Sequence, residues 1–150
     1  MPPSLSIRRA APDDVVRIAP LFDGYRRFYE QASDPAGAEA FIRARLASDE
    51  SVIFLALCDE TSAGFTQLYP IFSSVRMIRV WLLNDLYVEA EFRRAGVGRA
   101  LMGRAIEHAR ETGYGGVELA TAANNHRAKA LYEDLGFFRE DGFDHYALTL

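Results

Sequence analysis

Apolar and polar residues follow one another along this chain in two spacings, one typical of strands and one typical of helices. Strand-like segments occupy 5–10, 51–58, 63–70, 76–88, 117–121 and 143–150. Helical spacing follows Pro12-Asp13-Asp14, spans 36–47, begins again at Val97 and returns at 125–135. The middle strands are joined by hairpins, so the order predicts an α/β protein with a mixed sheet and not a simple doubly wound fold.

Composition narrows the class of protein. The 150 residues suit one domain spanning 1–150, and a net charge of −4 leaves no basic excess for tracking nucleic acid. The single cysteine, Cys58, rules out an intramolecular disulfide and fits a core position in a reducing cytoplasm. The start of the chain does not resemble a signal peptide, and no apolar run approaches the roughly 20 residues of a membrane span. His108, His126 and His145 lack metal-ligand spacing, so we expect no metal.

The segment RRAGVGRALM, residues 93–102, carries the most distinctive chemistry. It follows the long strand candidate and runs into helical spacing. Gly96 and Gly98 allow a tight turn and leave the backbone amides open to an anion, and a helix N-terminus adds unpaired N–H groups. Alternatively, a helix simply starts with Gly-x-Gly between surface arginines. A nucleotide-binding P-loop needs lysine and Ser/Thr where Arg99 and Ala100 stand, and a dinucleotide fingerprint needs glycine at Leu101.

Three segments together carry a resemblance to a known family. Val88-x-x-x-x-Arg93-x-x-Gly96-x-Gly98 is similar to motif A of the GCN5-related N-acetyltransferase (GNAT) superfamily. Asn125 through Phe137 resembles motif B, and Ile7-Arg8-x-Ala10-x-x-x-Asp14 resembles the entry to the first helix. The resemblance spans nearly the whole chain. It departs from the common pattern at Ala90, where many members have proline, and at Arg94, where glycine is common and where a positive φ would be awkward.

The resemblance implies a GNAT fold and a cosubstrate, acetyl-coenzyme A. The expected fold is a mixed sheet of six to seven strands with about four helices, splayed between its fourth and fifth strands. The pyrophosphate would lie on the glycine loop and the pantetheine along the end of the preceding strand. The implied cofactor-binding residues are Leu86, Tyr87, Val88, Arg93, Arg94, Ala95, Gly96, Val97, Gly98, Arg99, Ala100, Asn125, Ala128 and Tyr132.

Two residues are expected to carry the transfer chemistry. Tyr132 matches the family tyrosine that protonates the leaving thiolate in many members; without the motif it reads as a core residue of an amphipathic helix. Asp85 is the candidate to bind or deprotonate the amine, because a strand carboxylate needs a role or a partner; alternatively it faces solvent or pairs with an arginine. Asn125 either contacts pantetheine or caps the helix, and Asn124 is equally eligible as the cap.

The acceptor site is expected to include Tyr25, Tyr29, Glu30, Asn84 and Asp85, where aromatic rings and acids could hold an ammonium. Residues 25–30 also read as the end of an amphipathic helix. A looser resemblance to polyamine and thialysine acetyltransferases implies a small polyamine- or lysine-like primary amine and a homodimer. The other hypotheses are acetylation of a protein lysine or N-terminus, and a coenzyme A-binding sensor without turnover.

Overall fold

Five strands form the sheet of this protein in the computed structural model, which describes residues 3–150. They are β1 (Leu5–Arg9), β2 (Val52–Cys58), β3 (Thr61–Ser73), β4 (Ile78–Val88) and β5 (Val117–Glu118), side by side in that order. Neighbouring strands are antiparallel except β4 and β5, which are parallel. The chain divides into two units, one ending at Leu119 and the other running from Ala120 to Leu150.

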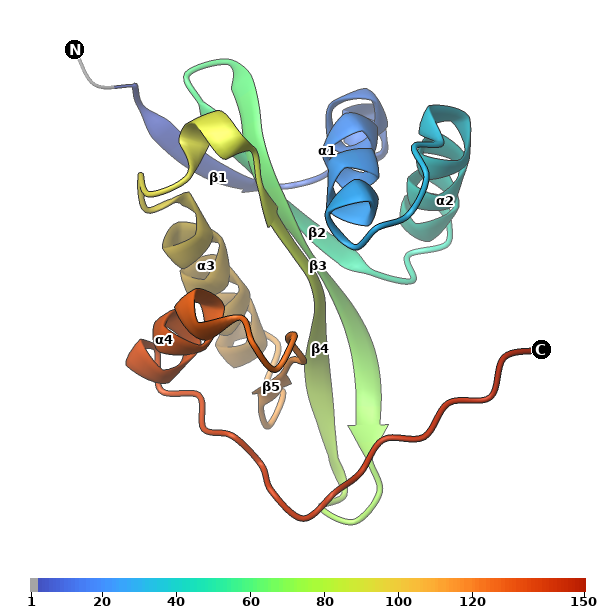
Figure 1. Ribbon diagram of the computed structural model, residues 1–150, viewed down its shortest axis with the longest axis vertical. Coiled ribbons are helices and arrows are strands. Elements are labelled where there is room, and N and C mark those ends of the chain that lie inside the picture. Colours follow the sequence, from blue (N-terminus) through green and yellow to red (C-terminus); the bar gives the residue numbers. More distant parts are fainter. Residues whose placement is uncertain (1–2) are drawn as a thin grey trace. The chain divides into compact units, whose positions relative to one another are not determined.

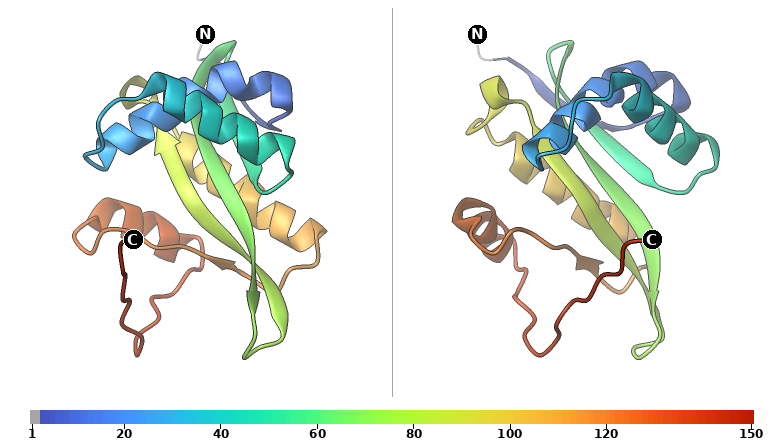
Figure 2. Two further views of the ribbon diagram at one scale, coloured as in Figure 1. Left: turned by 90° about the vertical axis from the view of Figure 1, so that its right-hand side faces the viewer. Right: turned by 45° about the vertical axis from the view of Figure 1, so that its right-hand side comes forward.

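In the first unit, helices cover both faces of the sheet. The helices α1 (Val15–Phe28) and α2 (Pro35–Ala47) lie on one face, and α3 (Val97–Glu111) lies on the other (Figures 1 and 2). The apolar stripes of α1 and α2 pack against alternate residues of β2 and β3, which forms a core that includes Ile18, Ile42, Leu55 and Phe65. Short 3-10 turns, η1 (Pro12–Asp14) and η2 (Ala90–Phe92), precede α1 and α3.

Local chemistry explains where these elements begin. The Asp34 carboxylate accepts a hydrogen bond from Gly37 N at 3.0 Å, and Pro35 stands at the first position of α2, where its missing N–H is harmless. All seven residues of β2 are buried, as its unbroken apolar run predicts. Pro20 lies inside α1, which continues to Phe28. Among the described residues, no helix is long and apolar enough to cross a membrane.

The strand count differs from the expected six to seven. Residues 143–150 alternate in polarity but form no strand, and 117–121 contributes only Val117–Glu118. Alternation gives a segment one apolar face, but a strand also needs a neighbour for its backbone N–H and C=O groups. No ladder partner for 143–150 occurs in the described chain, and large side chains there, such as Tyr146 and Leu148, are exposed.

The second unit contains one helix, α4 (His126–Asp134). Asn125 is its N-cap: the side-chain oxygen accepts a hydrogen bond from Ala128 N at 3.2 Å. Of the two candidate asparagines, Asn125 therefore makes the cap. The helix ends at Asp134 with Leu135 as its C-cap, and Gly136 follows with φ 97°.

His108 gives the fold a predicted pH dependence. It is buried on α3 in contact with the rings of Phe54 and Trp81. Burial lowers its pKa most, and the positive charges of Arg9 and Arg104 lower it further. The folded state therefore favours neutral imidazole, and its stability falls as pH drops below the unfolded value of 6.5. We expect His108→Phe to reduce the loss of stability between pH 7.5 and pH 5.5 in chemical denaturation. An identical loss in wild type and variant would contradict this role.

Candidate active site

The loop between β4 and α3 places backbone amides at the start of a helix. Gly96 is the N-cap of α3 and has φ 82°. It has no side chain to cap the helix, and the first α-helical bond runs from Ala100 N to Gly96 O at 3.0 Å. The amides of the first turn therefore point out of the helix end, where an anion gains both hydrogen bonds and the helix dipole. Arg94 stands where glycine is common in the family, and it also has a positive φ, 67°. A residue with a side chain is strained in this conformation.

The edge of β4 next to this loop has few strand partners. Its pairing with β5 consists of Trp81 with Val117 and Leu82 with Glu118, whereas β4 continues to Val88. In the described chain, residues 83–88 have no strand beyond them on that side. The backbone N–H and C=O groups along this edge can therefore form hydrogen bonds with an extended ligand, in the same way that they would pair with another strand. The predicted cofactor residues Leu86, Tyr87 and Val88 lie at this end of β4 and are half-buried.

Arg93 ties the loop to the end of β4. Its Nε donates a hydrogen bond to Val88 O at 2.9 Å, and its guanidinium lies 5.8 Å from the Tyr87 ring centroid and 5.9 Å from that of Phe28. The bond to Val88 fixes the turn between strand and helix and keeps the positive charge beside the exposed loop. The structure thus brings Arg93 together with the predicted residues Tyr87 and Val88.

A β-bulge interrupts β4 two residues before Leu86. Gln67 of β3 pairs with Asp85, but the next residue, Leu68, pairs with Leu83, so Asn84 is the extra residue. A bulge bends a strand and redirects its side chains, and bulges occur often beside active sites. Asn84 is exposed here, and its backbone oxygen accepts a hydrogen bond from the Tyr25 hydroxyl at 3.0 Å.

Asp85 lies in a buried chain of hydrogen bonds beside the bulge. Asn84 Nδ2 donates to its Oδ1, and Gln67 Nε2 donates to its Oδ2, each at 2.6 Å. Ser51 Oγ donates to Gln67 Oε1 at 2.7 Å, which fixes the orientation of the Gln67 amide. Asp85 is 1% exposed, so its carboxylate does not face bulk solvent. The alternative interpretations of Asp85, a carboxylate that faces solvent or one that pairs with an arginine, do not apply, because it is buried and its hydrogen-bond partners are amides.

Burial changes the acid–base properties of Asp85. Burial raises the pKa of its carboxyl group, and the hydrogen bonds from Asn84 and Gln67 act against this rise. Tyr69 lies close enough to Asp85 to respond to its charge. Burial of the phenol, and then the negative charge of Asp85, raise the pKa of Tyr69 to about 12. A buried carboxyl group with a raised pKa beside a neutral phenol is an arrangement that can accept a proton from an amine.

The predicted acceptor wall is only partly assembled around this network. Tyr25 contacts the bulge through Asn84, and its ring packs on Tyr29 with centroids 5.1 Å apart. Glu30 follows the end of α1 and is exposed, with φ 63°. The sequence reading missed Ser51, Gln67 and Tyr69. These polar residues could have been noticed because they interrupt two otherwise apolar strand segments. A polar side chain buried in such a strand requires a hydrogen-bond partner, which marks it as part of a polar cluster.

Tyr132 and Ala128 lie in α4 of the second unit and are half-buried. The Tyr132 ring lies 6.2 Å from that of Phe137. Asn125 is the N-cap of α4, and its side-chain oxygen accepts one hydrogen bond, from Ala128 N. Its side-chain NH2 group can still donate hydrogen bonds to a ligand. These residues stay predicted members of the site.

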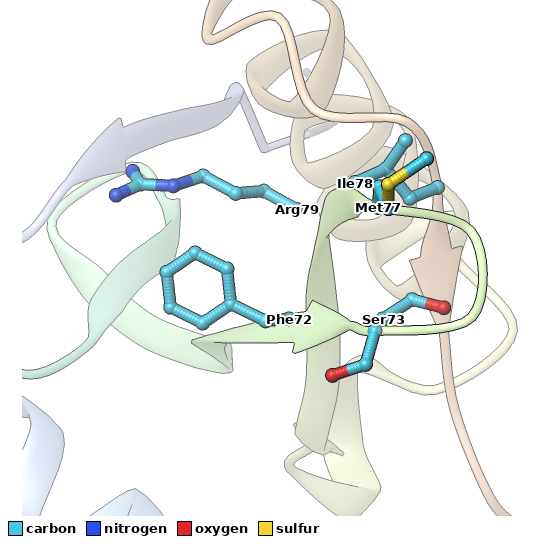
Figure 3. Close-up of a pocket in the computed structure, with 6 residues that line it drawn as sticks. Phe72, Ser73, Met77, Ile78 and Arg79 are labelled. Carbon is cyan, nitrogen blue, oxygen red and sulfur yellow. The ribbon is translucent and has the colours of Figure 1, made fainter.

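A separate pocket lies at the β3–β4 hairpin (Figure 3). Phe72, Ser73, Ser74, Met77, Ile78 and Arg79 line it. The Arg79 guanidinium lies over the Phe72 ring, 5.1 Å from its centroid, on the same side of the hairpin. None of the residues expected to carry the chemistry lines this pocket, so the candidate active site is the loop, bulge and network of β4.

Comparisons with known proteins show the family of this chain. The Acetyltransferase (GNAT) family profile matches residues 18–137. An uncharacterized N-acetyltransferase, YhfO, of Bacillus subtilis (strain 168) is 47% identical over 146 residues, which cover 97% of this chain and 98% of that protein. The crystal structure of a probable acetyltransferase is 41% identical, with a TM-score of 0.89 and 97% of each chain covered. A thialysine N-epsilon-acetyltransferase of Caenorhabditis elegans is 25% identical over 135 residues, 89% of this chain and 83% of its own. The chain therefore belongs to the GNAT family and is an N-acetyltransferase.

Proposed function

We propose that this enzyme transfers the acetyl group of acetyl-coenzyme A directly to a primary amine of a small polyamine- or lysine-like molecule. The observation that supports the cosubstrate is the loop at the start of α3, with Gly96 as a side-chain-free N-cap next to the open edge of β4. Its amides and the arginines 93, 94 and 99 suit a pyrophosphate. The similarity to a thialysine N-epsilon-acetyltransferase supports the acceptor class.

The reaction removes two protons from the acceptor ammonium. A bond forms between the amine nitrogen and the acetyl carbon, the carbon–sulfur bond breaks, and coenzyme A leaves as its thiol. Asp85 takes the first proton, which reaches its buried carboxylate through a water or the neighbouring Tyr69 hydroxyl. The hydrogen bonds from Asn84 and Gln67 hold that carboxylate in place. Tyr132 supplies a proton to the sulfur and is restored by the second proton from nitrogen.

The family profile extends across both units, which supports one N-acetyltransferase domain over residues 1–150. We place the enzyme in the cytoplasm because Cys58 is a buried free thiol. We also propose a homodimer, supported by the exposed aromatic residues Phe143 and Tyr146 near the C-terminus.

Titration with acetyl-coenzyme A followed by a screen for thiol release tests the proposal. The screen includes diamines, lysine analogues, aminoglycosides and peptides. Absence of acetyl-coenzyme A binding would overturn the proposed cosubstrate. Binding without turnover on any amine would favour a sensor, and turnover on peptides alone would favour a protein acetyltransferase.

The variant Tyr132→Phe tests the proton donor. We expect unchanged affinity for acetyl-coenzyme A and a fall in kcat of about 100-fold, the lower end of the usual contribution of a general acid. The measurement is calorimetric binding alongside steady-state thiol release. Tyr114→Phe, another half-buried tyrosine, is the control and should retain kcat. An unchanged kcat in Tyr132→Phe would remove Tyr132 from this role.

A further inference from the structure

A shallow pocket opens beside the Asp85 network on the face of the sheet covered by α1 and α2. It is lined by Phe41 and Arg45 of α2, Glu50 of the following turn, and Tyr69 and Pro70 of β3. Tyr69 connects the pocket to the network, because its phenol responds to the charges of Asp85, Arg45 and Glu50 together. An acceptor in this pocket would therefore have its amine near Tyr69 and its other end near α2.

Arg45 is held in a defined orientation at that other end. Its Nε donates a hydrogen bond to Glu50 Oε1 at 3.0 Å, and its guanidinium lies 4.4 Å from the Phe41 ring centroid. The side chain is 26% exposed. Within the described chain, its two terminal nitrogens make no hydrogen bond, so their N–H groups remain open to a ligand. A planar guanidinium with this fork unoccupied matches the two oxygens of a carboxylate.

Tyr69 provides the complementary group near the reacting amine. Its hydroxyl has no hydrogen-bond partner among the described residues, and it is half-buried. A phenol with a pKa of about 12 stays protonated at neutral pH, so it can accept a hydrogen bond from an ammonium while Asp85 supplies negative charge behind it. The pocket thus has an amine-binding end at Tyr69, with the buried Asp85 behind it, and an anion-binding end at Arg45.

We propose that this pocket is the acceptor subsite, that Arg45 binds a carboxylate of the acceptor, and that the acceptor is an amino acid-like primary amine rather than a polyamine. The inference rests on the proposed function and narrows its acceptor class. A polyamine would place a second ammonium beside Arg45, where like charges repel. An amino acid such as lysine adds a carboxylate beside that ammonium, which can pair with the guanidinium, and Glu50 continues to hold the Nε side of the guanidinium.

Lysine and cadaverine form the matched probe pair, because they differ only in the carboxylate. We expect wild-type kcat/KM for lysine to exceed that for cadaverine by at least about tenfold, the effect of one charge-assisted contact of about 1.4 kcal/mol. In Arg45→Gln, KM for lysine should rise at least about tenfold with kcat for lysine nearly unchanged, whereas KM for cadaverine should fall, because the charge that repels its second ammonium is gone. Arg43→Gln is the control: this arginine lies on the same helix, is exposed and pairs with Glu39.

Arg45→Lys separates the two properties of the side chain, because it keeps the charge and loses the fork; we expect an intermediate KM for lysine. Equal kcat/KM for the two probes in wild type would overturn the inference, as would an Arg45→Gln variant that weakens both equally. If no amine releases thiol, the proposed function fails separately. Calorimetric binding of lysine and cadaverine then decides the subsite: loss of lysine binding in Arg45→Gln supports it, and unchanged binding overturns it.

Discussion

Replacing Gly96 by glutamate is expected to weaken acetyl-coenzyme A binding at least about 100-fold while the protein stays folded. A Cβ at Gly96 would meet no atom within 4 Å, so the added side chain fits without displacing a neighbour. Its carboxylate would stand at the helix end that the pyrophosphate is proposed to occupy. Two unit charges about 4 Å apart repel by about 4 kcal/mol at an effective dielectric constant of about 20, more than the roughly 2.7 kcal/mol of a 100-fold change.

The backbone at Gly96 requires a control for strain, since a side chain at φ 82° costs about 1–2 kcal/mol. Gly96→Gln has the same shape and strain without the charge, so it should lose much less affinity than Gly96→Glu. Gly113→Glu places the same charge just past the other end of α3, where φ is 73° and a Cβ also meets nothing within 4 Å. It should leave affinity unchanged. Retained binding in Gly96→Glu, measured by calorimetry, would show that the loop is not the pyrophosphate site.

The position of this loop could be predicted from the sequence because its determinants are local. Gly96 stands between an apolar strand and a helical repeat, so its place in the chain follows from its neighbours. The strain at Arg94 could not be predicted in the same way. Its φ of 67° occurs in a loop that Arg93 ties to Val88 O, and the sequence of the loop does not specify that bond.

The bulge and the network at Asp85 escaped prediction for a related reason. Register is set between strands, and the mismatch at Asn84 exists only because Gln67 and Leu68 lie opposite it. Asp85 could be nominated because a strand carboxylate needs partners, but its partners come from two other segments of the chain, Ser51 and Gln67. The unformed strand at 143–150 has the same origin: its own pattern was suitable, but strand formation depends on a neighbour elsewhere.

These nonlocal features connect the fold to the proposed chemistry. The amides of Asn84 and Gln67 come from the bulged strand and its neighbour, and they contact opposite oxygens of Asp85. These hydrogen bonds hold the carboxylate in one orientation and favour its charged form, while burial acts in the opposite direction and keeps its pKa raised. A base in this state accepts a proton more readily than an exposed carboxylate does.

Asp85→Asn is expected to lower kcat/KM by a factor of about 100 to 10,000, the usual contribution of a general base. The new amide would also turn an N–H toward Gln67 Nε2 or Asn84 Nδ2, which places two donors together at a cost of about 1–3 kcal/mol in stability. Asp23→Asn is the control. Asp23 is 6% exposed and accepts bonds from Ser33 Oγ and Asp34 N, both at 2.7 Å, so its loss should affect stability and leave kcat/KM nearly unchanged.

The pH dependence separates a proton acceptor from a merely structural carboxylate. The Asp85 pKa is raised in the folded state, so activity should fall as pH drops through that raised value and the base becomes protonated. For the same reason, folding stability due to Asp85 falls as pH rises from the ordinary value of 3.8 to the raised one, because the folded state holds the proton more tightly. At Asp23 the pKa is lowered, chiefly by the hydrogen bonds from Asp34 and Ser33, so its stabilisation is present above 3.8 and is lost as pH falls through the lowered value.

Gln67→Met keeps Asp85 and tests the same assignment without placing two donors together. It removes a hydrogen bond that favours the carboxylate, so the acidic limb of the kcat/KM profile should move to higher pH. A structural role for Asp85 would lower activity equally at all pH values and leave the limb in place. An Asp85→Asn enzyme with wild-type kcat/KM, or an acidic limb that Gln67→Met does not move, would assign the base to another group.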